Sequence, residues 1–155
     1  MMDIAELITP QSVLPTLKSA GKRQLLQELS KRAAQLTSVD EKIIFDSLME
    51  RERLGSTGIG AGTAVPHGRV PGIARIVGLF ARLEKPIPFE SVDDKPVDLV
   101  FVLLTPVSAG AEHLTALARV SRIFRDRVIC QKLRGTTAAD ALYALLTDRT
   151  ASHAA

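Results

Sequence analysis

The chain has 155 residues, of which 46% are hydrophobic and 24% charged, and it carries a net charge of +3. This length fits one folded domain with its own core, and the composition excludes a disordered or fibrous chain. Apolar runs such as Leu99 to Leu104 are far shorter than the roughly 20 residues that a membrane helix needs. The acidic N-terminus is unlike a secretory signal, and a lone Cys130 can form no internal disulfide. We therefore expect a cytoplasmic protein without membrane insertion, one domain over residues 1–150 and a frayed tail over residues 151–155.

Helical periodicity dominates the first third of the chain. After an irregular start, apolar residues at helical spacing predict a helix from about Gly21 to Leu36. Ser38 and Glu41 match a capping box, which predicts a second helix that runs to about Arg53.

The middle of the chain alternates turn-forming and strand-forming segments. Residues 55–72 are rich in glycine and turn-prone, Ile73 to Leu83 reads as a strand, and Lys85 to Pro88 reads as a loop. Val97 to Leu104 is almost continuously apolar, the pattern of a central strand covered on both faces.

Helices return in the last third. Glu112 to Arg125 and Val128 to Leu133 have helical patterns, and Thr137 with Asp140 forms an acidic variant of the capping box that opens a last helix to about Leu146. The order of elements predicts an α/β fold, a three-layer sandwich in which a mixed sheet has helices on both faces.

The excess positive charge also lies in this last third. Arg119, Arg122 and Arg125 recur at every third position, as on the solvated face of an amphipathic helix. Aromatic residues make up only 4% of the chain, so few side chains could stack on bases. We therefore expect no nucleic-acid partner.

The residues best suited to chemistry lie between Arg51 and Arg69. Four glycines fall between Gly55 and Gly62, which predicts a tight turn or the close approach of another group, such as an anion, to the backbone. The spacing matches neither the dinucleotide fingerprint nor the phosphate-binding loop of nucleotide hydrolases, so we expect no cofactor.

His67 lies between Pro66 and Gly68, which predicts an exposed imidazole that a partner can approach. A neutral ring nitrogen is a nucleophile, and phosphoryl transfer to it needs mainly in-line positioning and hydrogen-bond donors. Arg51 and the hydroxyls of Ser56 and Thr57 could supply such donors. The alternative is a histidine in an ordinary surface turn.

His113 falls in the first turn of the helix after the central strand, where open sheets place functional groups. Two imidazoles could share one phosphoryl group, one as acceptor and one as donor. No Asp, Glu or Cys has metal-ligand spacing to either histidine, so we expect no metal. A hydrolase of the Ser-His type lacks support because no Gly-x-Ser-x-Gly motif occurs.

The run from Arg51 to Gly60, followed by Ala64 to Gly68, resembles the active-site signature of the mannitol/fructose-type (type 2) EIIA proteins of the phosphoenolpyruvate-dependent phosphotransferase system. The blocks Pro96 to Pro106 and His113 to Arg119 resemble the same family, and the resemblance covers nearly the whole chain. The stretch Leu83 to Phe89 is most similar to the nitrogen-regulatory branch, EIIA-Ntr.

The resemblance implies a mixed, mostly five-stranded sheet flanked by helices. It implies that His67 accepts a phosphoryl group from an HPr-like phosphocarrier (NPr), that His113 supports the reaction, and that Arg51 binds the phosphoryl oxygens. It also implies a phosphotransferase component that regulates target proteins, potassium transport regulators among them, according to its phosphorylation state. A sugar-specific EIIA that passes phosphate to an EIIB and a non-covalent anion-binding module remain as alternatives.

Three further residues receive simpler interpretations. Cys130 is expected to be a small core residue, and Glu52 a surface charge. Arg69, just past His67, could contact phosphate or guide an acidic carrier.

Overall fold

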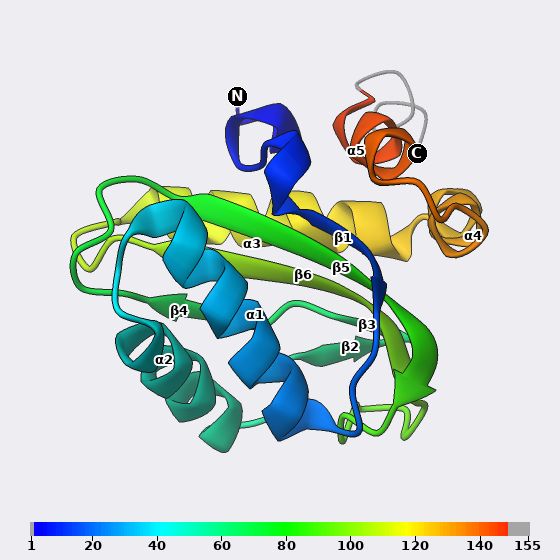
Figure 1. Cartoon of the computed structure of the whole chain (residues 1–155), viewed down its shortest axis with the longest axis horizontal. Coiled ribbons are helices and arrows are strands. Elements are labelled where there is room, and N and C mark those ends of the chain that lie inside the picture. The colour runs from blue at the N-terminus through cyan, green and yellow to red at the C-terminus, as the bar shows by residue number, and fades with distance from the viewer. Residues whose placement is uncertain (1, 149–155) are drawn as a thin grey trace.

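A central strand, β6 (Val97–Thr105), organises the sheet in the computed structural model, which describes residues 2–148 (Figure 1). β6 pairs antiparallel with β5 (Val77–Ile87), and β5 pairs in parallel with the edge strand β1 (Val13–Leu17). The result is a mixed sheet of six strands.

The other edge of β6 carries two short parallel strands, one after the other. β3 (Thr63–Ala64) pairs with the first half of β6, and β4 (His67–Arg69) pairs with its last residues, where His67 lies opposite Leu103. β2 (Gly58–Gly60) completes this side by pairing antiparallel with β3. The interruption at Val65 and Pro66 places His67 at the start of β4, beside the carboxyl-terminal half of the central strand.

Helices cover both faces of the sheet. α1 (Lys22–Thr37) and α2 (Glu41–Arg53) lie on one face (Figure 1). The other face carries the remaining helical elements, which are the 3₁₀ helices η1 (Ile4–Glu6) and η2 (Pro10–Ser12) and the helices α3 (Ala111–Arg125), α4 (Arg127–Arg134) and α5 (Ala139–Thr147). The expected three-layer α/β sandwich is confirmed, with six strands instead of about five.

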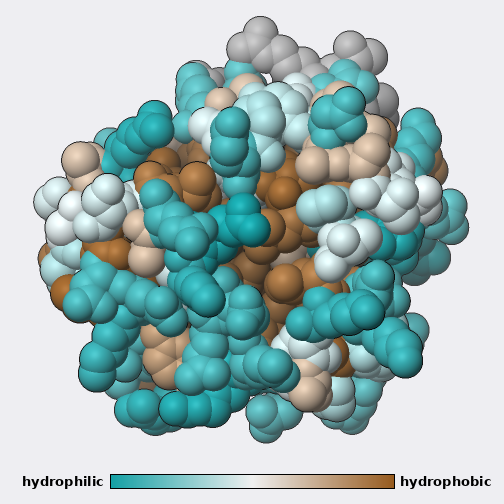
Figure 2. All heavy atoms as spheres, viewed as in Figure 1, coloured by the Kyte–Doolittle hydropathy of each residue, from teal (hydrophilic) through white to brown (hydrophobic). Residues whose placement is uncertain are grey.

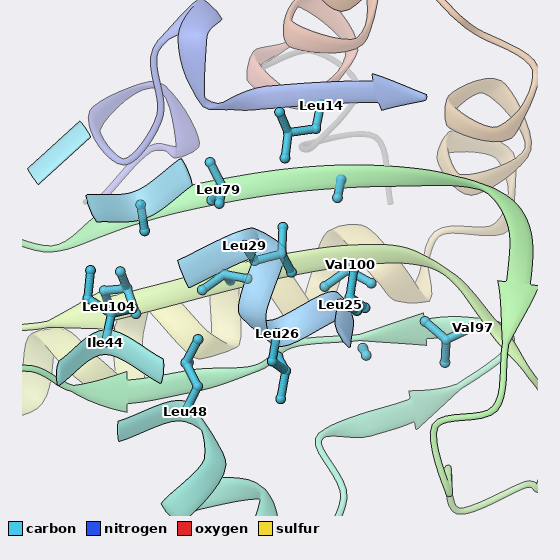
Figure 3. Packing of buried hydrophobic residues seen from close by; sticks show 14 of the residues in the cluster. Leu14, Leu25, Leu26, Leu29, Ile44, Leu48, Leu79, Val97, Val100 and Leu104 are labelled. Atoms are coloured by element: carbon cyan, nitrogen blue, oxygen red, sulfur yellow. The ribbon is translucent and has the colours of Figure 1, made fainter. Parts of the chain in front are cut away.

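The alternation of apolar side chains along β6 explains the three layers. Val100, Val102 and Leu104 face α1 and α2, whereas Leu99, Phe101 and Leu103 face the opposite helices. Figure 3 shows Val100 and Leu104 pointing into the cluster formed with α1 and α2. Figure 2 shows this side of the molecule from outside, with hydrophilic residues over most of its surface and hydrophobic ones visible near its centre. The prediction of a central strand covered on both faces is confirmed.

Two predicted irregular segments are strands. The start of the chain contains β1, and Lys85 to Ile87 continue β5 instead of forming a loop. The pairing between β5 and β6 shifts register between Arg82 and Ile87, so Pro86, which has no N–H to donate, lies where the ladder is irregular.

The two predicted capping boxes at helix starts are wrong. Ser38 adopts a left-handed conformation (φ 63°) at the end of α1, and the carboxylate of Asp40 caps α2 by accepting a hydrogen bond from the N–H of Lys42 at 2.8 Å. α5 begins after Ala138, which has no side chain able to cap. A carboxylate immediately before the first helical residue reaches the free N–H groups more directly than a hydroxyl further upstream.

No helix within residues 2–148 is long and apolar enough to cross a membrane. The tail over residues 151–155, for which fraying is predicted, lies outside the described residues. On α3, Arg122 and Arg125 are exposed as expected. Arg119 instead pairs with Asp3 at 3.4 Å and donates to the carbonyl of Met2, which ties α3 to the start of the chain.

Candidate active site

The backbone next to His67 fixes the orientation and tautomer of its ring. The ring Nδ1 lies 2.8 Å from the carbonyl oxygen of Val65. Because a carbonyl oxygen can only accept, Nδ1 carries the proton and Nε2 carries the lone pair. The ring nitrogen that is free to act as a nucleophile is therefore Nε2.

Arg51, in the last turn of α2, faces this nitrogen. Its Nε donates to Nε2 of His67 at 3.2 Å, and its Nη1 donates to the carbonyl of Gly55 at 2.8 Å. The two hydrogen bonds hold the guanidinium plane in one orientation beside the imidazole, which a lysine could not reproduce.

Gly68 sets the distance between α2 and β4. A Cβ at this position would lie 2.4 Å from Oγ of Ser47 and 3.3 Å from the Ser47 carbonyl oxygen. The same serine donates from Oγ to the carbonyl of Arg69 at 2.8 Å. The group that approaches Gly68 is thus helix α2 of the chain itself, and this close packing brings Arg51 to His67.

His113 completes the group from the other side. It lies in the first turn of α3 with only 9% of its surface exposed, and its ring centroid is 5.6 Å from that of His67. Its Nδ1 lies 2.8 Å from the hydroxyl of Thr105, the last residue of β6. The loop between β6 and α3 therefore brings together two histidines that are far apart in the sequence.

Both histidines are held in their neutral forms. Burial lowers the pKa of His67, and the charge of Arg51 lowers it further against the opposing effect of the Val65 carbonyl. Burial also lowers the pKa of His113, with additional contributions from Arg69 and from His67. At neutral pH Nε2 of His67 is therefore unprotonated, and its lone pair accepts the hydrogen bond from Arg51.

A surface cavity of about 780 Å³ opens over the two imidazoles. It is lined by Ile43, Asp46, Ser47, Glu50, Arg51, Leu54, His67, Gly68, Arg69, Pro71 and His113. Arg69 reaches the carbonyl of Ala109 through Nη1, in the loop that leads to His113. The cavity therefore combines two neutral imidazoles and two guanidinium groups with the carboxylates of Asp46 and Glu50, and its guanidinium groups are able to hold a small anion beside His67.

Ser56 and Thr57, expected to contact a phosphoryl group, are not among the residues that line this cavity. The hydroxyl of Ser56 donates to the carbonyl of Phe89 at 2.7 Å, and Thr57 is buried with its hydroxyl directed to the carboxylate of Glu52. Both hydroxyls serve the packing of the segment that precedes β2.

The glycines of this segment also serve packing and turning. Gly60 and Gly62 adopt positive φ angles in the turn between β2 and β3. A Cβ on Gly58 would lie 2.2 Å from Oγ of Ser91, so this glycine lets the segment after β5 pack closely. The predicted tight turn is confirmed, and the group that approaches is another part of the chain.

Two neighbours of the site escaped the sequence analysis. Thr105 is the last residue of β6, and its hydroxyl contacts Nδ1 of His113. Its place at the end of the apolar strand is the one feature of the sequence that could have indicated this contact. Glu52 was expected on the surface but is 8% exposed, because the N–H and hydroxyl of Thr57 and the ammonium of Lys22 surround its carboxylate. Cys130 is a buried core residue, as predicted.

Within residues 2–148, no group of three or more His, Cys, Asp or Glu side chains is arranged to hold a metal ion.

Comparison with known proteins relates this arrangement to a family. The model of the family described as phosphoenolpyruvate-dependent sugar phosphotransferase system, EIIA 2, matches residues 6–149. A nitrogen regulatory protein of Bradyrhizobium diazoefficiens is 52% identical over 145 residues, covering 94% of this chain and 95% of the relative. A nitrogen regulatory protein of Escherichia coli K12 is 34% identical over 148 residues, covering 95% of this chain and 91% of the relative.

The fold agrees with the sequence comparison. The crystal structure of nitrogen regulatory protein IIA-Ntr from Neisseria meningitidis superposes with a TM-score of 0.88 at 34% identity, covering 93% of this chain and 99% of the other. Family model, relatives and structure all extend over almost the full length, including the segments that carry Arg51, His67 and His113. The chain therefore belongs to the EIIA type 2 family of the phosphoenolpyruvate-dependent phosphotransferase system, together with the nitrogen regulatory proteins.

Proposed function

We propose that this protein accepts a phosphoryl group on Nε2 of His67 from an HPr-like phosphocarrier of the NPr type. The observation that carries the proposal is the hydrogen bond from Nδ1 to the Val65 carbonyl, which leaves the Nε2 lone pair next to Arg51 at an accessible cavity. Membership of the phosphotransferase family supplies the reaction class.

The transfer step is an exchange of one P–N bond for another. The Nε2 lone pair of His67 attacks the phosphorus of the carrier's phosphohistidine, and the bond from phosphorus to the carrier's ring nitrogen breaks with its electron pair returning to that nitrogen. No net proton moves. The His67 ring gains positive charge in the product, and the Val65 carbonyl that accepts from Nδ1 then stabilises it more strongly.

Arg51 and His113 act on the transferred group. Arg51 must withdraw its Nε–H from the Nε2 lone pair, after which the guanidinium can donate to the phosphoryl oxygens. His113 can donate from its own Nε2 in the tautomer whose Nδ1 accepts a hydrogen bond from the Thr105 hydroxyl. Pre-arranged donors of this kind stabilise the charge of the transferred group with little reorganisation.

The surroundings of the cavity support a protein as phosphoryl donor. Leu54 and Ile43 line the cavity with 81% and 42% of their surfaces exposed, and Leu114, directly after His113, is 68% exposed. Exposed apolar side chains around a reactive group favour contact with another macromolecule. A phosphoryl group placed among them adds about two negative charges, which changes the proteins that this surface can bind.

We further propose that the phosphorylation state regulates target proteins; the resemblance to the nitrogen-regulatory branch implies potassium transport regulators among them. The main alternative is a sugar-specific EIIA that delivers the group to an EIIB, since the family description refers to sugar phosphotransfer. Transfer of the phosphoryl group from the phosphorylated protein to a purified fructose- or mannitol-type EIIB would establish the alternative.

The test is intact-mass spectrometry after incubation with phosphoenolpyruvate, the first enzyme of the system and an HPr-like carrier. We expect one acid-labile phosphoryl adduct on the wild type and none on His67→Ala. Arg51→Lys and His113→Gln should still form the adduct, at rates lowered by about 10- to 100-fold. An adduct on His67→Ala, or none on the wild type with several carriers, would contradict the proposal; reversible anion binding without an adduct would favour the binding module.

A further inference from the structure

A buried carboxylate lies directly behind the candidate active site. Glu52 follows Arg51 in the last turn of α2, and its side chain is 3% exposed. Its carboxylate accepts from the N–H of Thr57 at 3.0 Å and from the Thr57 hydroxyl. It therefore fixes the segment that leaves α2, although it does not line the cavity.

Lys22 neutralises this carboxylate from a third segment. Its Nζ lies 2.9 Å from Oε2 of Glu52 and 3.4 Å from the carboxylate of Glu90, and it stands 4.7 Å from the ring centre of Phe89. Lys22 is the first residue of α1, where the helix dipole disfavours a cation. The two carboxylates and the ring of Phe89 explain why a lysine occupies this position. The contacts of Glu52 and Lys22 join the start of α1, the end of α2 and the residues after β5.

The contacts lead from this pair to the nucleophile. The carbonyl of Gly55, between Glu52 and Thr57, accepts from Nη1 of Arg51, and Nε of the same guanidinium donates to His67. Movement of the Gly55–Thr57 segment would release one of the two hydrogen bonds that orient Arg51. Glu52 reaches the Arg51 guanidinium through this segment, and its charge also acts on His67, whose pKa it raises against the larger lowering by burial.

We propose that Glu52, with Lys22, is a positioning residue that holds the Gly55–Thr57 segment so that Arg51 is oriented toward His67. The inference rests on the proposed phosphoryl transfer for its kinetic consequence. Its structural consequence, the orientation of Arg51, exists in the unphosphorylated protein.

The competing explanation is an ion pair that serves folding alone. Removing one partner of a buried pair leaves an uncompensated charge, whereas replacing both by neutral residues is often neutral for stability. A Lys22→Met/Glu52→Gln protein lacks both charges, so it separates stability from positioning. Glu84→Gln provides a matched control, since it changes the same group in an exposed ion pair with Lys18.

The experiment measures three quantities for each variant: the single-turnover phosphoryl-transfer rate, the urea midpoint, and the NMR signal of the Arg51 Nε–H. We expect Glu52→Gln and the double variant to lose about tenfold or more in rate, because small displacements of a positioned group have large kinetic effects. Their Arg51 signal should move toward that of a solvent-exposed arginine. The double variant should keep a midpoint near that of the wild type, and Glu84→Gln should match the wild type throughout.

Rates within about twofold of the wild type, or a slowed rate with an unchanged Arg51 signal, would overturn the proposal. If Glu52→Gln does not fold, the transfer rate and the Arg51 signal of the double variant test the proposal. If the wild type accepts no phosphoryl group, the proposed function fails, and an unmoved Arg51 signal in the variants would refute the positioning role separately.

Discussion

At the scale of single residues, the tautomer of His67 depends on one backbone carbonyl. Because Val65 accepts from Nδ1, the lone pair is confined to Nε2, on the side of Arg51. Burial and the neighbouring guanidinium keep the ring neutral. His113 is held neutral in the same way by burial and by Arg69. Two neutral imidazoles therefore lie side by side at the cavity.

The lowered histidine pKa values predict how stability depends on pH. The ordinary histidine pKa is 6.5, so between that value and the lowered values in the folded protein the unfolded chain binds more protons than the folded one. The contribution of the two neutral histidines to stability is therefore complete above pH 6.5, and it is lost as the pH falls through their lowered pKa values. Urea unfolding at about pH 7.5 and about pH 5 should show the decrease.

The matched comparison for this prediction is His67→Gln/His113→Gln, which lacks both titrating rings. Its free energy of unfolding should change less between the two pH values than that of the wild type. Equal changes in the two proteins would show that other groups control the pH dependence.

At the scale of elements, the site depends on how closely α2 packs on β4. This contact needs both the absence of a side chain at Gly68 and the hydrogen bond from Ser47 to the carbonyl of Arg69. Since Arg51 lies one turn after Ser47 on the same helix, the packing at Gly68 also sets the position of the guanidinium.

Gly68→Ala should therefore lower both stability and transfer. The new Cβ would lie 3.3 Å from the Ser47 carbonyl oxygen as well as 2.4 Å from the movable Oγ, so the helix backbone itself must shift. Overpacking of this kind destabilises by about 1–3 kcal/mol, measurable by urea unfolding. Gly21→Ala is the control because no atom lies within 4 Å of its Cβ position. If the two variants were equally stable, close packing at Gly68 would not be the constraint.

At the scale of the whole molecule, two apolar cores lie on opposite faces of one sheet and share its central strands. Leu29 of α1 belongs to the first core and Leu133 of α4 to the second, and both are fully buried. β5 and β6 contribute side chains to both cores. If one core unfolded, these two strands would lose their packing on that face, and the other core would be destabilised as well.

We therefore expect one cooperative unfolding transition. Leu29→Ala and Leu133→Ala should each lower the free energy of unfolding by about 2–5 kcal/mol while leaving the denaturant dependence unchanged. Circular dichroism and the fluorescence of Tyr143, the one tyrosine of the sequence, would report the same midpoint in each variant. Two separated transitions would instead indicate two independent folding units.

The sequence predicted the long elements better than the short ones. α1, α2 and β6 are periodic over many residues, so their apolar patterns located them. β2, β3 and β4 are too short for periodicity, and the glycines between them suggested turns alone. The burial of Glu52 could not be read from its neighbours, because its partner Lys22 is 30 positions away.

Local sequence was enough to predict the layers of the fold, and it singled out His67, Arg51 and His113 as candidate site residues. Apolar alternation fixed which strand is central, and His67, Arg51 and His113 carry motifs that local sequence displays. Long-range packing, in contrast, sets which ring nitrogen of His67 is unprotonated and which donor faces it, and it directs the hydroxyls of Ser56 and Thr57 to other partners. The reason is physical: periodicity is a property of neighbouring residues, whereas hydrogen-bond geometry depends on which distant segments packing brings together.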